Sequence, residues 1–141
     1  METVRSVMST DVAYCTPLDN VYEAAVLMKE HHIGAIPIVD HNELVGMVTD
    51  RDIVIRGIAE KRPGSFQITN VMSDDLYTIS PDASLEEAAR LMADKQIRRL
   101  PVVENGQLIG MLSLGDLSVN YQTEDEAGDA LSEISEPPHF H

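Results

Sequence analysis

Apolar residues recur at helical spacing in two stretches of the chain, and each stretch opens with a residue suited to start a helix. Asn20 precedes one stretch and Ser84 precedes the other, and each has a glutamate three residues later, at position 23 or 87. This is the spacing of a helix N-cap and its third helical residue. The pattern predicts one amphipathic helix beginning at residue 21 and another beginning at residue 85.

Short apolar runs on either side of these helices predict strands. In each half a run ends at a hydroxyl residue followed by proline (Thr16-Pro17 and Ser80-Pro81), where proline stops a strand and starts a turn. Two further runs are separated by residues 41–42 in the first half and by Asn105-Gly106 in the second, which favours a hairpin. The predicted strands are 12–15, 35–39 and 44–48 in the first half, and 76–79, 100–103 and 108–112 in the second.

The two halves repeat each other at a fixed spacing of 64 residues, without a gap. The identical pairs include Val7-Met8-Ser9 with Val71-Met72-Ser73, Glu23-Ala24-Ala25 with Glu87-Ala88-Ala89, Gly46-Met47 with Gly110-Met111, and Asp52 with Asp116. Each half reads β-α-β-β-α. One such unit of about 60 residues buries too little surface to be comfortable alone, so we expect two units that share a core.

The repeats are expected to span 1–64 and 65–122, with Pro63-Gly64 as the break between them. Residues 123–141 form an acidic tail. Thr123 and Glu126 have capping-box spacing, and the apolar residues that follow predict a short amphipathic helix. The sequence leaves open whether this helix docks on its own domain, on a dimer mate or on a partner protein. Its apolar residues are Ala127, Ala130, Leu131 and Ile134.

Charge excludes several classes of partner. The formal net charge is −14, from 10 basic and 24 acidic residues, and residues 119–141 hold six acids with no Lys or Arg. This field repels nucleic acid and anionic lipid headgroups, so we expect neither as a partner. The chain shows no signal-peptide pattern and no apolar run long enough to span a bilayer, so a cytoplasmic location is expected.

Candidate catalytic and metal-binding residues are few. The chain has no Walker loop, no zinc signature and no nucleophile with an evident base partner, so we expect no catalysis, no metal and no required cofactor. His31 and His32 are adjacent, and adjacent helical side chains point about 100° apart, which disfavours a shared metal. Cys15 is the single cysteine and aligns with Ile79, which favours a buried apolar role.

A hydroxyl residue followed three positions later by aspartate occurs at the same place in both halves, as Thr49 with Asp52 and as Ser113 with Asp116. Helix capping alone, worth about 1 kcal/mol, explains this spacing. The same geometry also suits a ligand, because a carboxylate accepts both hydroxyls of a ribose and a hydroxyl beside free N–H groups receives a phosphate. Both interpretations remain open at this stage.

The repeat length, the element order, the proline after the first strand and the motifs from Gly46 to Asp52 and from Gly110 to Asp116 resemble the CBS domain. Up to about residue 120 the chain resembles a stand-alone bacterial CBS-domain pair, or Bateman module. This resemblance implies an α+β fold in which two β-α-β-β-α CBS repeats pack through their sheets with pseudo-two-fold symmetry, followed by the short C-terminal helix. It also implies a homodimer and an adenosine-type ligand, such as AMP, ADP, ATP or S-adenosylmethionine.

By the same resemblance, two clefts form between the repeats. The first would contain Thr49, Asp52, Ser80, Ile97, Arg98 and Arg99, and the second Thr16, Gly34, Ala35, Ser113 and Asp116. Gly34-Ala35 replace the two arginines in the second cleft, so we expect the first to be favoured for an anion. The expected function is a regulatory module that signals to an effector protein through repeat or dimer orientation. The alternative is a ligand-free interaction or structural protein whose motifs only cap helices.

Overall fold

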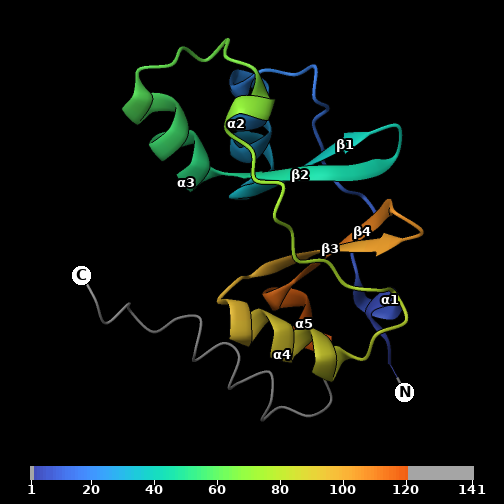
Figure 1. The fold of residues 1–141 in the computed structure, drawn as a ribbon. Helices are drawn as coiled ribbons and strands as arrows, with labels where there is room; N and C mark the ends of the chain where they lie inside the picture. The colour runs from blue at the N-terminus through green and yellow to red at the C-terminus, as the bar shows by residue number, and fades with distance from the viewer. Residues whose placement is uncertain (1, 121–141) are drawn as a thin grey trace. The chain divides into compact units, whose positions relative to one another are not determined.

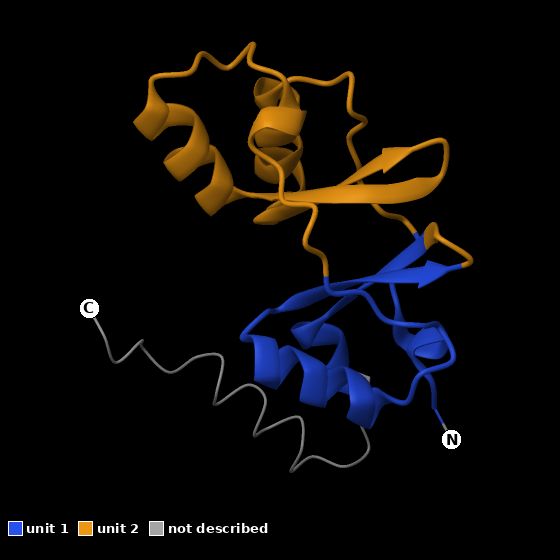
Figure 2. Ribbon diagram, in the orientation of Figure 1, with its two compact units in different colours: residues 1–10, 77–104, 109–141 blue, residues 11–76, 105–108 orange. Residues whose placement is uncertain are grey.

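The computed structural model describes residues 2–120, which form two compact units. Within these residues, unit 1 contains 2–10, 77–104 and 109–120, and unit 2 contains 11–76 and 105–108 (Figure 2). The predicted helix of the acidic tail lies outside the described residues. The repeat boundaries predicted along the chain, 1–64 and 65–122, stay a prediction. Each compact unit contains most of one repeat together with a segment of the other.

Unit 2 is built around one long helix and one hairpin (Figure 1). Its elements are α2 (Val21–His31), β1 (Ala35–Asp40), β2 (Glu43–Thr49), α3 (Asp50–Asp52), the π-helix η1 (Ile53–Gly57), and the 3-10 helices η2 (Ile58–Glu60) and η3 (Ile68–Asn70). Strands β1 and β2 are antiparallel, with Ala35 opposite Thr49. The turn between them takes positive φ at His41 and Asn42, as the predicted hairpin requires.

Unit 1 repeats this plan. Its elements are α1 (Val4–Val7), α4 (Leu85–Lys95), β3 (Arg99–Glu104), β4 (Gln107–Ser113) and α5 (Leu114–Asn120). Strands β3 and β4 are hydrogen-bonded neighbours. Residues 105–108, which are the turn joining them and the first two residues of β4, belong to unit 2. There Gln107 pairs with Glu43, and the Leu44 amide donates to the Gly106 carbonyl at 3.3 Å. Asn105 and Gly106 both have positive φ, which confirms the predicted turn.

The helix starts follow the sequence prediction. The Asn20 side chain accepts a hydrogen bond from the Glu23 amide, and the Ser84 side chain accepts one from the Glu87 amide, each at 3.1 Å. Both helices end in a residue with left-handed backbone, His32 after α2 and Gln96 after α4. The caps therefore fix where each long helix begins and turns back into its strand.

The first predicted strand of each repeat is shorter than expected. Residues 12–15 contribute one parallel bridge, Cys15 with Ile38, and residues 76–79 contribute one, Ile79 with Val102. Cys15 donates to the Pro37 carbonyl at 3.0 Å and accepts from the Val39 amide at 2.8 Å. The proline that follows two residues later ends the pairing, so an apolar run that looked like a strand is reduced to a single paired residue.

Segments from the start of each repeat pack in the unit of the other. The Val4 amide donates to the Ala83 carbonyl at 2.9 Å, and the corresponding Ile68 amide donates to the Asp19 carbonyl at 3.1 Å. Ser9 likewise pairs with Met111, as Ser73 pairs with Met47. All these contacts repeat at the 64-residue spacing, so the repeat governs which segments meet as well as which elements form.

Each unit has its own aliphatic core. Buried residues of unit 1 include Val4, Ala88, Met92, Leu100, Leu112 and Leu117. Those of unit 2 include Cys15, Ala24, Ile36, Ile38, Val48 and Ile68. Val4 and Ile68 come from the exchanged segments and are fully buried, so these segments complete the cores they join. Among the described residues, no helix is long and apolar enough to cross a membrane.

Candidate functional site

Thr49 and Asp52 lie at the junction of β2 and α3 and form a capping box. The Thr49 hydroxyl accepts from the Asp52 amide, and Asp52 Oδ2 accepts from the Thr49 amide, both at 3.0 Å. Both residues are half-buried. Among residues 2–120, Asp52 Oδ1 receives no hydrogen bond, so one oxygen of this carboxylate caps the helix and the other remains available to a ligand.

Ser113 and Asp116 form the same arrangement at the junction of β4 and α5. The Ser113 hydroxyl accepts from the Asp116 amide at 3.1 Å, and Asp116 Oδ2 accepts from the Ser113 amide at 2.9 Å. The capping role expected for both motifs is therefore confirmed in both units. At Asp52, capping does not exclude a ligand, because the cap uses Oδ2 and leaves Oδ1.

The two boxes have different neighbours. In unit 2 the Gly34 carbonyl accepts from the Asp50 amide at 2.9 Å, and a β-carbon on Gly34 would lie 3.0 Å from Asp50 Oδ2. In unit 1 the corresponding bond joins the Leu114 amide to the Arg98 carbonyl at 2.8 Å. The Asp50 carboxylate therefore lies against Gly34, and the uncharged Leu114 stands at the position of Asp50 in unit 1.

Arg98 and Arg99 follow directly after α4, where the chain turns into β3. Gln96 takes a left-handed conformation and the half-buried Ile97 donates its amide to the Met92 carbonyl at 3.0 Å, which fixes the approach to the arginines. Arg98 is exposed and Arg99 is half-buried. Within the described part of the chain, neither guanidinium forms an ion pair. Guanidinium groups pair well with anions, so the role of Arg98 and Arg99 at an anion site stays a prediction.

The turns that carry Thr16 and Ser80 share one hydrogen bond and differ in another. The Thr16 hydroxyl accepts from the Leu18 amide at 3.3 Å, as the Ser80 hydroxyl accepts from the Asp82 amide at 3.2 Å. The Thr16 amide also donates to Asp19 Oδ2 at 2.7 Å, whereas Ala83 stands at the position of Asp19 in unit 1.

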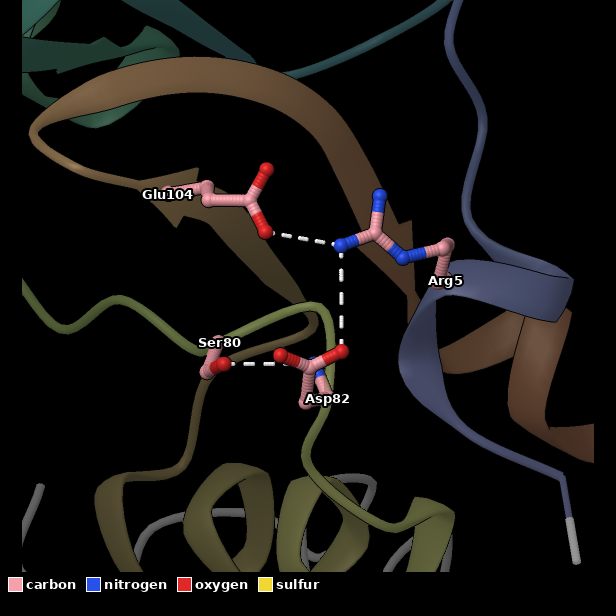
Figure 3. Close-up of polar contacts among 4 residues, drawn as sticks. All are labelled: Arg5, Ser80, Asp82 and Glu104. Atoms are coloured by element: carbon pink, nitrogen blue, oxygen red, sulfur yellow. Dashed lines mark hydrogen bonds and ion pairs between the residues drawn. The ribbon is translucent and has the colours of Figure 1, made fainter.

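Arg5 supports the Ser80 turn from α1, and sequence reasoning did not find it. Its amide donates to the Pro81 carbonyl at 2.9 Å, and its Nη2 lies 2.7 Å from Glu104 Oε2 and 3.7 Å from Asp82 Oδ1 (Figure 3). The repeat gave no signal, because Thr69 stands at the corresponding position. The pairing with Glu104 also spans 99 residues of chain, beyond the reach of local pattern.

Cys15 lies against two acids in unit 2. Burial first, and then the negative charges of Asp19 and Glu23, raise the pKa of the Cys15 thiol from 9.0 to about 12. The interaction between the two carboxyls lowers the pKa of Asp19 and raises the pKa of Glu23. A thiol with so high a pKa is neutral at physiological pH, which fits the buried apolar role and not a nucleophile.

Among residues 2–120, no group of three or more His, Cys, Asp or Glu side chains is placed to hold a metal ion. His31 and His32 stand at the end of α2, and both are exposed.

The CBS-domain family model matches residues 4–57 and again residues 68–121. The chain belongs to the CBS-domain family. These two matches coincide with the two halves of the 64-residue repeat, so the family, the double repeat and its mixed helix and antiparallel-sheet fold are confirmed. Stand-alone CBS-domain proteins are regulatory and not catalytic, which confirms the non-enzymatic prediction on the ground of family.

The chain is 52% identical over 138 residues to the uncharacterized protein YlbB of Bacillus subtilis, covering 96% of this chain and 93% of that protein. A crystal structure of Hypoxic Response Protein I with two coordinated zinc ions is 36% identical, with a TM-score of 0.75, over 84% of this chain and 98% of the other. A crystal structure of CBSX2 in complex with AMP is 30% identical, with a TM-score of 0.74, over 84% and 95%.

The residues predicted for each CBS cleft are divided between the units. For the first cleft, unit 2 holds Thr49 and Asp52, and unit 1 holds Ser80, Ile97, Arg98 and Arg99. For the second, unit 1 holds Ser113 and Asp116, and unit 2 holds Thr16, Gly34 and Ala35. Within one unit, the structure brings together Thr49 with Asp52, Ser113 with Asp116, Gly34 with the start of α3, and Arg98 with the start of α5. The joining of each full set stays a prediction.

Proposed function

We propose that this CBS protein is a regulatory module that binds an adenosine-type nucleotide through Asp52 and the Arg98–Arg99 pair. The observation that carries the proposal is the absence of any ion pair at these two guanidiniums among residues 2–120, in a chain whose net charge is −14. Support for the ligand class comes from CBSX2, a family member of the same fold that was crystallised with AMP.

The ribose is assigned to Asp52. A vicinal diol needs acceptor oxygens, and Asp52 Oδ1 is unoccupied within the described chain while Oδ2 is engaged by the Thr49 amide. The capping box holds the carboxylate in one orientation, which lowers the entropy lost when a sugar binds.

The phosphate is assigned to Arg98 and Arg99, with Ser80 as a hydroxyl partner. Arginine presents its N–H groups in a planar fork that matches phosphate oxygens, and such charge-assisted bonds are stronger than neutral ones. The second set has Gly34 and Ala35 in place of the arginines, and Asp50 lies over Gly34. A phosphate there would meet a carboxylate instead of a guanidinium, so the proposal includes one strong site and one weak or empty site.

Signalling follows from differential affinity. A ligand held by residues from both repeats shifts the protein toward the arrangement that it binds better, and by no more than the difference in its two affinities. A homodimer, an effector protein that reads the shift and a cytoplasmic setting belong to this proposal and stay predictions.

A second function is favoured by a specific observation. Both hydroxyl–aspartate pairs form complete capping boxes from their own atoms, so helix capping alone explains the motifs if the protein is a ligand-free interaction or structural module. The two functions differ in whether Arg98 and Arg99 matter to any small molecule.

A thermal-shift screen separates them. AMP, ADP, ATP and S-adenosylmethionine are added to the wild-type chain and to Arg98→Ala/Arg99→Ala, with Arg90→Ala as the matched control, since Arg90 is an exposed arginine paired with Glu86. At 100 times Kd a ligand adds about 2.7 kcal/mol of stability. We expect a rise in Tm in wild type and control and none in the double variant. A flat screen in wild type, or an equal rise in all three proteins, would overturn the assignment.

A further inference from the structure

The turns at Thr16 and Ser80 have the same backbone frame. Each follows a one-residue parallel bridge to the hairpin of its own unit. In unit 2 the Asp19 amide donates to the Thr16 carbonyl at 3.0 Å, and in unit 1 the Ala83 amide donates to the Ser80 carbonyl at 3.1 Å. The amides of Thr16 and Ser80 therefore occupy corresponding places in the two units.

These two amides differ in what they donate to. The Thr16 amide donates to Asp19 Oδ2 at 2.7 Å, a short bond of the charge-assisted kind. The contact with Glu23 first, and then the bond from Thr16, lower the pKa of Asp19, so the acceptor is a carboxylate anion. Ala83 has no acceptor in its side chain, and within residues 2–120 the Ser80 amide has no hydrogen-bond partner.

The surroundings of Ser80 do not exclude an anion. Ser80 is exposed. The Asp82 carboxylate of the same turn lies 3.7 Å from the Arg5 guanidinium, which also pairs with Glu104, so Arg5 offsets part of their negative charge (Figure 3). Glu87 corresponds to Glu23, and the raised pKa of Glu23 shows that a glutamate at this position adapts to a neighbouring anion by holding its proton more tightly.

We propose that the residue three positions after the turn hydroxyl, Asp19 or Ala83, decides which turn receives the phosphate of the nucleotide. Asp19 fills the acceptor position of the Thr16 turn with the protein's own carboxylate. Ala83 leaves the corresponding position open, so a phosphate oxygen accepts from the Ser80 amide. The inference rests on the proposed function. It adds a backbone donor at Ser80 and gives the Thr16 turn an internal competitor for the ligand.

Calorimetry with AMP and adenosine tests the exchange of these residues. Ala83→Asp places the carboxylate of unit 2 in unit 1, and it is expected to weaken AMP binding by about tenfold, because the carboxylate takes the Ser80 amide and repels the phosphate. Ala83→Asn, which adds an acceptor without charge, should weaken it less. Val119→Asp is the control, because it adds the same charge on α5 at an 83% exposed position, and it should leave AMP binding unchanged. Adenosine has no phosphate, so Ala83→Asp should not weaken its binding.

The Ser80 amide resonance gives a second and direct readout. In ¹H–¹⁵N spectra of wild type, AMP should move the Ser80 amide proton downfield, as a new hydrogen bond does, and should leave the Thr16 amide in place. In Ala83→Asp the Ser80 amide should already lie downfield and should not respond to AMP. The same spectra show whether the variant is folded.

The outcomes separate this inference from the proposed function. A Ser80 amide that stays in place while AMP binds, AMP binding that ignores Ala83→Asp, or an equal loss of AMP and adenosine binding would overturn the inference alone. A wild-type chain that does not bind AMP would overturn the proposed function, and the inference with it.

Discussion

Units 1 and 2 are built on the same repeated plan, but the helical segments that follow their hairpins differ. In unit 1, α5 buries Leu114 and Leu117, and the neighbouring helix α4 buries Leu85, Ala88, Ala89 and Met92. In unit 2 the corresponding segment passes from α-helix through a π-helix to a 3-10 helix, and α2 buries only Val21 and Ala24. The hydrogen-bond pattern changes twice in eleven residues there.

The difference shows that the repeat preserves the residues that begin helices and form turns better than the residues that follow them. Both hydroxyl–aspartate boxes, both N-caps and both hairpin turns recur at corresponding positions. Charges and exposed residues beyond them diverge, as Arg98-Arg99 against Gly34-Ala35 and Asp50-Arg51 against Leu114-Gly115 show. Local hydrogen bonding thus fixes the common frame, and the diverged positions carry whatever distinguishes the two halves. The predictions below test this contrast, beginning with the largest effect.

Cys15 gives unit 2 a titratable core residue where unit 1 has Ile79. Because folding raises the pKa of the thiol from 9.0 to about 12, its contribution to stability is complete below pH 9 and is lost as the pH rises toward 12. Denaturant unfolding of wild type should therefore weaken over that range by about 1.4 kcal/mol per pH unit relative to Cys15→Ala. Parallel pH profiles for the two proteins would show that the thiol titrates normally in the fold.

Gly110 and Gly46 are corresponding residues, but the space available for a β-carbon differs between them. A β-carbon on Gly110 would lie 2.9 Å from the Ser9 carbonyl oxygen, whereas one on Gly46 would lie 3.2 Å from that of Ser73; both would also meet the flexible end of a methionine. Gly110→Ala should cost about 1–3 kcal/mol of unfolding free energy, and Gly46→Ala should cost less. The two chemical-denaturation curves give the ranking, and a larger loss for Gly46→Ala would contradict it.

Ser84 and Asn20 cap corresponding helices with unequal support. At the start of α2, the Val21 amide also donates to the Phe66 carbonyl at 2.9 Å, and the Tyr22 amide donates to the Gly64 carbonyl at 2.8 Å. Ser84→Ala should therefore cost about 1 kcal/mol, and Asn20→Ala less. Thermal melts of both variants measure the contrast. Equal losses would mean that the Phe66 and Gly64 carbonyls do not stabilise the start of α2.

Arg5 is expected to give the smallest effect. Its side chain is half-exposed, and exposed ion pairs contribute at most about 1 kcal/mol. Arg5→Ala should lower stability by less than that and should lose the difference in high salt, with Arg90→Ala as a comparison of the same size. A loss that salt does not reduce would mean that Arg5 acts by packing.

Much of the frame could be predicted from the sequence because short-range chemistry determines it. Asn20, Ser84, Thr49 and Asp52 act on amides three residues away, and Asn105-Gly106 needs only its own backbone freedom. Residues close together in the sequence determine these features, and most of them recur 64 residues later.

The remaining features depend on contacts between distant segments. The exchange that places Val4 beside Ala83 and the pairing of Arg5 with Glu104 leave no local pattern. The single-residue bridges at Cys15 and Ile79 were overpredicted as strands, because apolar runs of that length do not reveal how many residues pair. The candidate site likewise depends on distant segments, because its predicted residues belong to two units.

The contrast between Arg98-Arg99 and Gly34-Ala35 is tested most directly by calorimetric titration of the wild-type chain with AMP. One molecule of AMP per chain is expected at the strong site, and Arg98→Ala/Arg99→Ala should abolish its heat. Two equal sites per chain, or unchanged binding in the double variant, would contradict the account.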